Sequence, residues 1–203
     1  KAMGREKGAH ILGIHLEGPF LSPERIGGQE QEGISPVDLA YMERIYKTAK
    51  GKIINMTVAP ELKGMRDLAL YCIEKGIILQ AGHTNATYDQ MIEGMQANIM
   101  HVTHMFNAMR PLHHREPGTV GAALTHPEIS CEIIGDGVHV NPNLIQLLMK
   151  SKPLSQLVLI TDSLKYAKAE IPADADFYFD QCFKRKADNV IIGSGITMLD
   201  GFK

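Results

Sequence analysis

The sequence predicts an α/β fold in which parallel strands alternate with helices and curl into a (β/α) barrel. Three observations predict this fold. Short apolar runs rich in Ile, Val and Leu recur along the chain, segments of helical periodicity separate them, and polar or ionisable side chains follow each run directly. Continuous apolar runs are typical of strands buried in a parallel sheet. A barrel brings the carboxyl ends of all its strands to one face, where active sites lie.

Six apolar runs are the predicted strands. In chain order they are Ile11–Leu16, Ile53–Val58, Ile77–Ala81, Asn98–Thr103, Ile129–Ile134 and Leu157–Thr161. Each run has the length of a strand, and helical segments lie between consecutive runs. We therefore expect a series of βα units with a parallel sheet.

Four segments between these runs have helical periodicity. The first starts at Ser35-Pro36-Val37-Asp38, which is interpreted as a capping box with proline at the first helical position, and Gly51 is its predicted stop. Gly76 is the predicted stop of the second helix. The apolar positions of the other three helices are Met65, Leu68, Ala69, Cys72 and Ile73; Tyr88, Met91, Ile92 and Met95; and Leu144, Ile145 and Leu148 after the cap Asn141-Pro142.

Residues 1–172 are predicted to form the barrel domain that carries the metal and the active site. A complete TIM-type (β/α)8 barrel has eight units and about 250 residues, whereas about six units are counted here, so we expect an incomplete barrel. Residues 173–203 differ, because FYFDQCF, NVIIGSG and GITM look like short antiparallel strands with glycine turns. They predict a short β-rich tail, either a remnant of a small β-sandwich or the last barrel unit, joined through a linker at Ala173–Asp176.

The composition excludes several classes of protein. The chain has 203 residues, of which 44% are hydrophobic and 22% charged, as in globular proteins rather than disordered ones. Lys and Arg number 21 against 23 Asp and Glu, so no nucleic-acid partner is expected. No apolar run reaches the roughly 18 residues that span a bilayer, so no membrane partner is expected. Cys72, Cys131 and Cys182 form no CxxC pair and favour the reducing cytoplasm.

The chemistry-bearing side chains lie where the predicted strands end. Glu17 ends the first strand, His83 follows the third, His104 follows the fourth and Asp162 follows the sixth. Glu17, His83 and His104 form a mixed nitrogen and oxygen ligand set that suits a divalent transition metal such as Zn²⁺. Three protein ligands leave one position open, which is typical of a catalytic site. Asp162 is the candidate general base that takes a proton from the attacking water.

Seven motifs occur around these residues. They are HLEGPF (15–20), VAPE (58–61), AGHTNATY (81–88), THMFNAM (103–109), REPG (115–118), GDGVHV (135–140) and ITD (160–162). In order and spacing they resemble the N-acetylglucosamine-6-phosphate deacetylases of the metal-dependent amidohydrolase superfamily. The resemblance covers roughly residues 10–163 and implies the (β/α)8 barrel of the amidohydrolases. It also implies cytoplasmic hydrolysis of the acetamide of N-acetylglucosamine 6-phosphate to glucosamine 6-phosphate and acetate.

The resemblance implies a role for each matching residue. Glu17, His83 and His104 would hold one divalent ion, Zn²⁺ in the first place, with Fe²⁺ or another divalent ion as alternatives. Asp162 would activate the water and then protonate the leaving amine. The residues that would contact the phosphosugar substrate are Gln29, Asn107, Ala108 through its backbone, Arg115 and His139. Arg115 would reach the phosphate across the interface of a homodimer.

Two alternatives stay open beside the deacetylase. Another amidohydrolase acting on a cyclic amide usually carries a carboxylated lysine at a strand end, and no lysine stands at the six strand ends here. A non-catalytic fragment that binds metal or sugar phosphate is the second alternative. The first two βα units and the His-x-His pair that many amidohydrolases carry on the first strand are missing from the given sequence, so a second metal site cannot be assembled from it, and the choice between one and two metals stays open.

Other polar residues are predicted to have structural roles. His15 and His101 are expected to pack within the barrel rather than to bind a metal. Asp136 is expected to support the turn before His139. Two roles are equally compatible with Glu61. It either hydrogen-bonds residues next to the site or forms a salt bridge at the mouth of the barrel.

Overall fold

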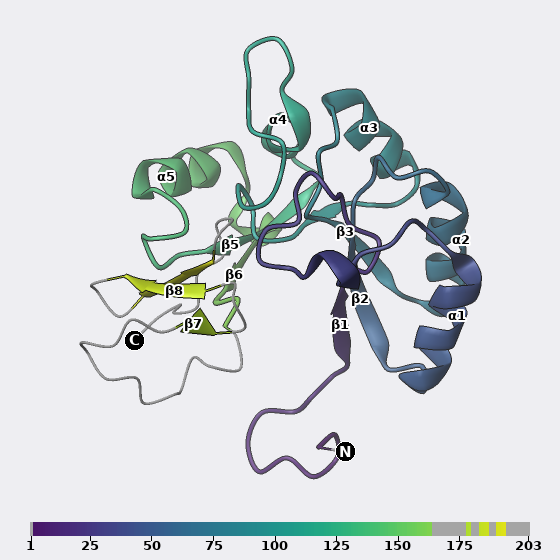
Figure 1. Ribbon diagram of the computed structural model, residues 1–203. Helices are drawn as coiled ribbons and strands as arrows, with labels where there is room; N and C mark the ends of the chain where they lie inside the picture. Colours follow the sequence, from purple (N-terminus) through teal and green to yellow (C-terminus); the bar gives the residue numbers. More distant parts are fainter. Residues whose placement is uncertain (1, 164–177, 180–182, 187–189, 194–203) are drawn as a thin grey trace.

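The computed structural model describes residues 2–163, 178–179, 183–186 and 190–193. Within 2–163, six parallel strands lie in the order β1-β2-β3-β4-β5-β6, so each strand pairs with its neighbours in the chain. The sheet curls into a partial barrel with helices along its outer side (Figure 1). The predicted α/β fold with six parallel strands is confirmed. β1 and β6 are the two edges of this sheet.

Five strands fall within the predicted runs, and β1 extends one residue past its run, to Glu17. The bounds of the six strands are β1 (Ile14–Glu17), β2 (Ile53–Val58), β3 (Ile78–Ala81), β4 (His101–Val102), β5 (Ser130–Ile134) and β6 (Leu157–Ile160). β4 is much shorter than its apolar run. Asn98 before it and His104 after it have positive φ values of 66° and 32°, which interrupt the extended backbone on both sides.

The helices are α1 (Leu39–Thr48), α2 (Met65–Lys75), α3 (Tyr88–Gln96), α4 (Gly118–Thr125) and α5 (Pro142–Ser151). The capping box predicted at Ser35 is wrong. Asp38 is the N-cap, and its side chain accepts a hydrogen bond from the N–H of Tyr41. The N–H of Ser35 instead donates to the carbonyl of Pro19, which holds this residue against the loop after β1.

Helix α4 has no counterpart among the predicted helices. Its sequence, GTVGAALT, is small and apolar on every side, and residues 118–123 are all buried. A helix buried all round has no polar face, so the 3.6-residue alternation by which helices are recognised is absent. The periodicity of apolar residues therefore did not predict this helix.

The apolar core lies between the outer face of the sheet and the helices. Ile53, Val58 and Leu79 from the strands pack with Leu68 and Cys72 of α2. The methionines among the buried residues, such as Met42 and Met91, fill the same layer.

The inner face of the barrel is polar, which the apolar runs did not indicate. Thr57 Oγ1 lies 2.7 Å from His15 Nε2 and 2.9 Å from Thr103 Oγ1, and Thr103 donates to Gln80 Oε1 at 3.2 Å. Glu132 continues this layer by accepting from Gln80 Nε2 at 3.4 Å. Successive residues of a strand point to opposite faces, so one polar residue in two is enough to line the interior.

His101 belongs to the same layer. Its Nδ1 hydrogen-bonds Ser130 Oγ, and its Nε2 lies 3.4 Å from Glu132 Oε1. His101 is half-buried and has its partners within the barrel, as predicted for a packed residue. His15 contacts Thr57 but is exposed, so its predicted packing is not confirmed.

A separate three-stranded sheet is described in the tail. β7 (Tyr178–Phe179), β8 (Phe183–Lys186) and β9 (Val190–Gly193) pair antiparallel in that order. This agrees with the antiparallel strands predicted there. The predicted linker at Ala173–Asp176 and the GITM segment lie outside the described residues, and the division at residue 172 stays a prediction.

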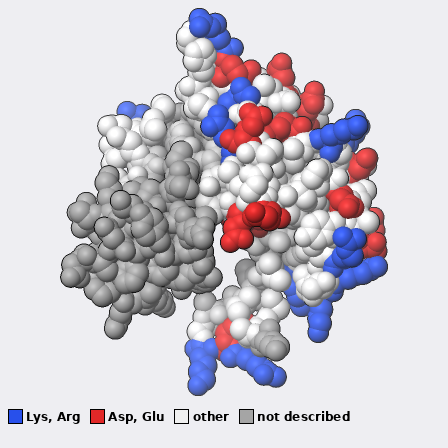
Figure 2. All heavy atoms as spheres, viewed as in Figure 1, with Lys and Arg blue, Asp and Glu red and all other residues white. Residues whose placement is uncertain are grey.

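Charged side chains are interspersed over the described surface. Figure 2 shows Lys and Arg alternating with Asp and Glu on one face, without a continuous basic patch among the described residues of that face. None of the helices in the described part of the chain is long and apolar enough to cross a membrane.

Candidate metal centre

Glu17, His83 and His104 converge at the carboxyl ends of β1, β3 and β4. Glu17 Oε1 lies 2.8 Å from His83 Nε2 and 3.1 Å from His104 Nε2, and the two Nε2 atoms are 3.1 Å apart. One ligand atom from each residue falls within 4.8 Å of the others, and no second group of three such residues occurs in the described ranges. The predicted ligand set is therefore assembled in space, and we call it the Glu17–His83–His104 triad.

The hydrogen bonding of His83 fits a metal ligand. Its Nδ1 lies 3.1 Å from the carbonyl oxygen of Arg25. A carbonyl only accepts, so Nδ1 carries a proton, and Nε2 is the ring nitrogen that faces Glu17 and His104. Ligating histidines usually have their second ring nitrogen fixed in this way. His104 is also buried, although its Nδ1 has no hydrogen-bond partner among the described residues.

Strained backbone is concentrated at this edge of the sheet. Seven non-glycine residues of the described part have positive φ, and five of them follow β3, β4 or β6. These five are His83 (46°), His104 (32°), Phe106 (78°), Ala108 (48°) and Asp162 (51°). Such conformations cost energy and persist where the surrounding structure over-determines them, which is common at functional sites.

The electrostatics of the triad favour a charged Glu17. Burial alone would raise the pKa of Glu17, but the hydrogen bonds and charges of His104 and His83 hold that pKa well below its ordinary value. Burial alone would lower the pKa of His104, but its hydrogen bond to Glu17 and the charges of Glu17 and Asp162 raise that pKa. A carboxylate that stays ionised among imidazoles is suited to bind a cation.

Asp162 shares a cavity with two members of the triad. The cavity has a volume of about 530 Å³ and is lined by His15, Glu17, Thr103, His104, Glu132, Leu159, Ile160, Thr161 and Asp162. Burial raises the pKa of Asp162, and the charge of Glu17 adds to this effect against the opposing charges of His104 and His139. A carboxylate with a raised pKa is a better proton acceptor, as a general base requires.

Gln29 contacts the triad directly. Its Nε2 donates to Glu17 Oε2 at 2.9 Å, on the carboxylate oxygen that does not face the histidines. The contact orients Glu17. The predicted contact of Gln29 with substrate stays a prediction.

Asn107 and Ala108 form the turn that follows His104. The amide of Asn107 donates to the carbonyl oxygens of His104 and Met105, each at 3.2 Å. The carbonyl of Ala108 accepts from the N–H of Thr84 at 3.1 Å, which joins this turn to the loop after β3.

His139 is held by Asp136, as predicted. Its Nδ1 lies 2.6 Å from Asp136 Oδ2, and Asp136 Oδ1 accepts from the N–H groups of Val138 and His139, both at 2.9 Å. The carboxylate therefore builds the turn and orients the ring.

Arg115 lies apart from the triad. It is exposed on the loop between β4 and α4, where its N–H donates to His113 Nδ1 at 3.2 Å. No hydrogen bond or ion pair within the described part of the chain links its side chain to Glu17, His83 or His104. Its predicted action across a dimer interface stays a prediction.

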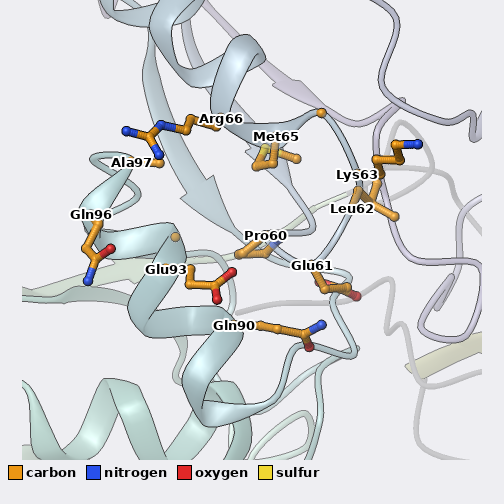
Figure 3. Close-up of a pocket in the computed structure, with 12 residues that line it drawn as sticks. Pro60, Glu61, Leu62, Lys63, Met65, Arg66, Gln90, Glu93, Gln96 and Ala97 are labelled. Atoms are coloured by element: carbon orange, nitrogen blue, oxygen red, sulfur yellow. The ribbon is translucent and has the colours of Figure 1, made fainter.

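Glu61 supports the loop after β3. Its Oε2 accepts from Thr84 Oγ1 at 2.5 Å, and its Oε1 accepts from the N–H of Asn85 at 2.6 Å. These two hydrogen bonds fit the supporting role of Glu61, and no ion pair of Glu61 occurs among the described residues. Glu61 also lines a cleft of about 520 Å³ between the start of α2 and α3 (Figure 3), which contains no member of the triad.

Sequence reasoning did not identify Arg25 and Asn85 as parts of the site. Arg25 supplies the carbonyl that binds His83, and its Nε donates to Asn85 Oδ1 at 3.1 Å. The position of Asn85 two residues after a ligand, within AGHTNATY, was the only available signal.

Comparison with known proteins agrees with this geometry. A model of the amidohydrolase family matches residues 1–179. This chain belongs to the amidohydrolase family. The N-acetylglucosamine-6-phosphate deacetylase of Bacillus subtilis (strain 168) is 42% identical to it over 158 residues, which cover 78% of this chain and 40% of that protein. The resemblance noted in the motifs is therefore confirmed.

Solved structures of amidohydrolases with the same fold extend the comparison. N-acetylglucosamine-6-phosphate deacetylase from Pasteurella multocida superposes with a TM-score of 0.83 at 31% identity, over 98% of this chain and 51% of that one. A mutant of the Mycobacterium smegmatis enzyme in complex with N-acetyl-D-glucosamine-6-phosphate superposes with a TM-score of 0.78 at 30% identity, over 93% and 49%. The chain thus spans about half the length of these relatives or less.

Proposed function

We propose that this chain carries the metal site and general base of a deacetylase that converts N-acetylglucosamine 6-phosphate to glucosamine 6-phosphate and acetate. The observation that carries the proposal is the convergence of Glu17, His83 and His104, with Asp162 in the same cavity. The names of the relatives supply the substrate class.

The reaction divides between the ion and the side chains. A divalent ion held by the triad, Zn²⁺ in the first place or Fe²⁺, would polarise the acetyl carbonyl and lower the pKa of a bound water. Asp162 takes the proton of the attacking water as the new carbon–oxygen bond forms. It then gives that proton to the amine nitrogen as the carbon–nitrogen bond breaks, which releases acetate and the free amine.

The substrate-binding side chains follow from the same proposal. Asn107, the backbone of Ala108 and Arg115 bind the phosphate, because amide and guanidinium N–H groups donate to anionic oxygen. His139, oriented by Asp136, and Gln29, bound to Glu17, contact the sugar and its acetyl group. The exposure of Arg115 supports its action on the active site of a partner subunit in a homodimer.

The two alternatives predict different results. A cyclic-amide hydrolase lacks support, because no lysine occurs directly after the six strands. A non-catalytic metal-binding chain would bind the ion without turnover. The open edges at β1 and β6 would favour this outcome if the remaining barrel strands are needed for catalysis.

Acetate release from N-acetylglucosamine 6-phosphate by the Zn²⁺-loaded chain tests the proposal, with a cyclic amide such as dihydroorotate as the competing substrate. We expect turnover of the phosphosugar alone, with loss of activity in Glu17→Gln. Glu43→Gln, at an exposed acid of α1, is the matched control and should keep full activity. Metal binding without acetate release would favour the non-catalytic alternative, and turnover of dihydroorotate would favour the cyclic-amide hydrolase.

A further inference from the structure

Asn85 uses all four of its polar groups in hydrogen bonds to three different loops. It lies two residues after His83, at the start of the segment that leads into α3. Its backbone N–H donates to Glu61 Oε1 (2.6 Å), its Nδ2 donates to Glu24 Oε2 (2.5 Å), its Oδ1 accepts from Arg25 Nε (3.1 Å) and its carbonyl accepts from Arg110 Nε (2.7 Å). These partners follow β1, β2 and β4, so Asn85 joins the loops on both sides of the loop after β3.

One of these bonds leads directly to a candidate metal ligand. The side chain of Arg25 is held by Asn85, while its carbonyl oxygen lies 3.1 Å from His83 Nδ1. The same loop also contacts His83 through the N–H of Ser22, which donates to the carbonyl of His83 at 2.8 Å. The orientation of the His83 ring therefore depends on where the loop after β1 holds the carbonyl of Arg25.

The loop after β1 packs closely on the ring of His83. Gly27 has a φ of 60°, and a Cβ at this position would lie 3.0 Å from Cε1 of His83 and 3.2 Å from Cβ of Ala108. A shift of the loop would therefore be transmitted to the ring, since there is no free space between them.

We propose that Asn85 is a positioning residue for the metal site, which holds Arg25 so that its carbonyl fixes the ring of His83 with Nε2 toward the ion. The inference rests on the proposed metal site at Glu17, His83 and His104. Partners behind a metal ligand fix its tautomer and orientation, and their loss typically weakens metal binding about 10–100-fold. Asn85 does not contact His83 itself but holds Arg25, whose carbonyl contacts the ring.

The test measures binding of Zn²⁺ and Co²⁺ to the full chain by chelator competition, together with the visible absorption of the Co²⁺ form. Asn85→Ala should weaken Zn²⁺ binding about 10-fold or more and change the Co²⁺ absorption. Arg25→Met keeps the backbone carbonyl but removes the Nε donor, so it should have the same effect. The double variant should show little further loss, because both substitutions break one link.

Two variants separate positioning from a general structural role. Asn85→Asp combined with Glu24→Gln exchanges donor and acceptor but keeps the oxygen that binds Arg25, so it should restore Zn²⁺ binding close to that of the unmodified chain. Asn143→Ala, at an exposed asparagine of α5, should leave binding unchanged. If Asn85 merely filled space, the nearly isosteric Asn85→Asp would bind Zn²⁺ normally by itself. We expect Asn85→Asp alone to weaken binding, because it sets a carboxylate against Glu24, and we expect Glu24→Gln to restore it.

The outcomes are distinguishable from failure of the proposed function. If Asn85→Ala and Arg25→Met are folded and bind Zn²⁺ as tightly as the unmodified chain, the inference is overturned while the metal site stands. If Asn85→Ala does not fold, Arg25→Met alone decides. If the unmodified chain binds no divalent ion, the metal site and this inference fail together.

Discussion

The Nε2 atoms of His83 and His104 lie 3.1 Å apart, although 21 residues separate them in the sequence. Their rings meet edge to face, and both nitrogens lie near the same oxygen of Glu17. Two imidazole nitrogens at this distance repel each other when both present lone pairs. A proton or a cation shared with the carboxylate removes the repulsion, so this contact is consistent with a site for a divalent ion.

Binding of one divalent ion should stabilise the chain, and Glu17→Gln should abolish most of this effect. At an ion concentration of 100 times Kd, the free energy of unfolding should rise by about 2.7 kcal/mol. Urea unfolding with and without Zn²⁺ measures the difference. His15→Gln is the control, because His15 contacts Thr57 rather than the triad. Equal stabilisation of Glu17→Gln and the unmodified chain would contradict the ligand assignment.

Asp162→Asn should lower kcat for deacetylation about 10²–10⁴-fold, because general-base catalysis contributes this much. Zn²⁺ affinity should change little, since Asp162 lines the cavity without belonging to the triad. Acetate release and metal titration of the same preparation check both parts. Full activity in Asp162→Asn would exclude Asp162 as the base.

Gly27→Ala should weaken metal binding, whereas Gly76→Ala should not. Both glycines have positive φ, so alanine at either position should cost about 1 kcal/mol of stability. Only at Gly27 would the added Cβ press on the ring of His83, while at Gly76 no atom lies within 4 Å. Thermal unfolding and Zn²⁺ titration are measured for both variants. Gly76→Ala reports the effect of backbone strain alone, and Gly27→Ala reports strain together with the contact to His83. The idea fails if the two variants bind Zn²⁺ equally well.

Acid should destabilise the chain in part through Asp136. Burial alone would raise the pKa of Asp136, but hydrogen bonds from the N–H groups of His139 and Val138 and from the ring of His139 lower it on balance. The resulting stabilisation is fully present above the unfolded-state pKa of about 3.9. It is lost as the pH falls through the lower pKa of the folded state.

Asp136→Asn should therefore lose less stability than the unmodified chain over this acidic range. Urea unfolding at a series of pH values from about 5 downward measures the free energy of unfolding of both proteins. Parallel pH curves would show that Asp136 contributes nothing to acid sensitivity.

Cys72 and Cys131 should resist thiol reagents in the folded chain. Burial raises the pKa of Cys72 to about 12 and that of Cys131 to about 11, so little thiolate is present near neutral pH. A chain with Cys182→Ser isolates these two thiols for labelling with a disulfide reagent at pH 8. Labelling should become fast only in denaturant, and fast labelling of the native chain would contradict the burial of both side chains.

The pattern of apolar and polar residues along the chain was sufficient to predict the strands and most of the helices. Five of the six strands lie within the apolar runs, and β1 extends one residue past its run, because a strand buried on its outer face is rich in apolar residues. Pattern failed at α4, which lacks a polar face, and at the start of α1, where Asp38 rather than Ser35 caps the helix.

The sequence by itself determined the parallel α/β architecture and named the triad, because parallel strands bring their carboxyl ends together whatever the details of the loops. Only the tertiary structure decided that the barrel interior is a hydrogen-bonded polar layer, that Arg25 orients His83 and that Asn85 ties three loops together. These features depend on distances between residues from different βα units. Such distances are set by packing and loop closure, which no periodicity along the chain records.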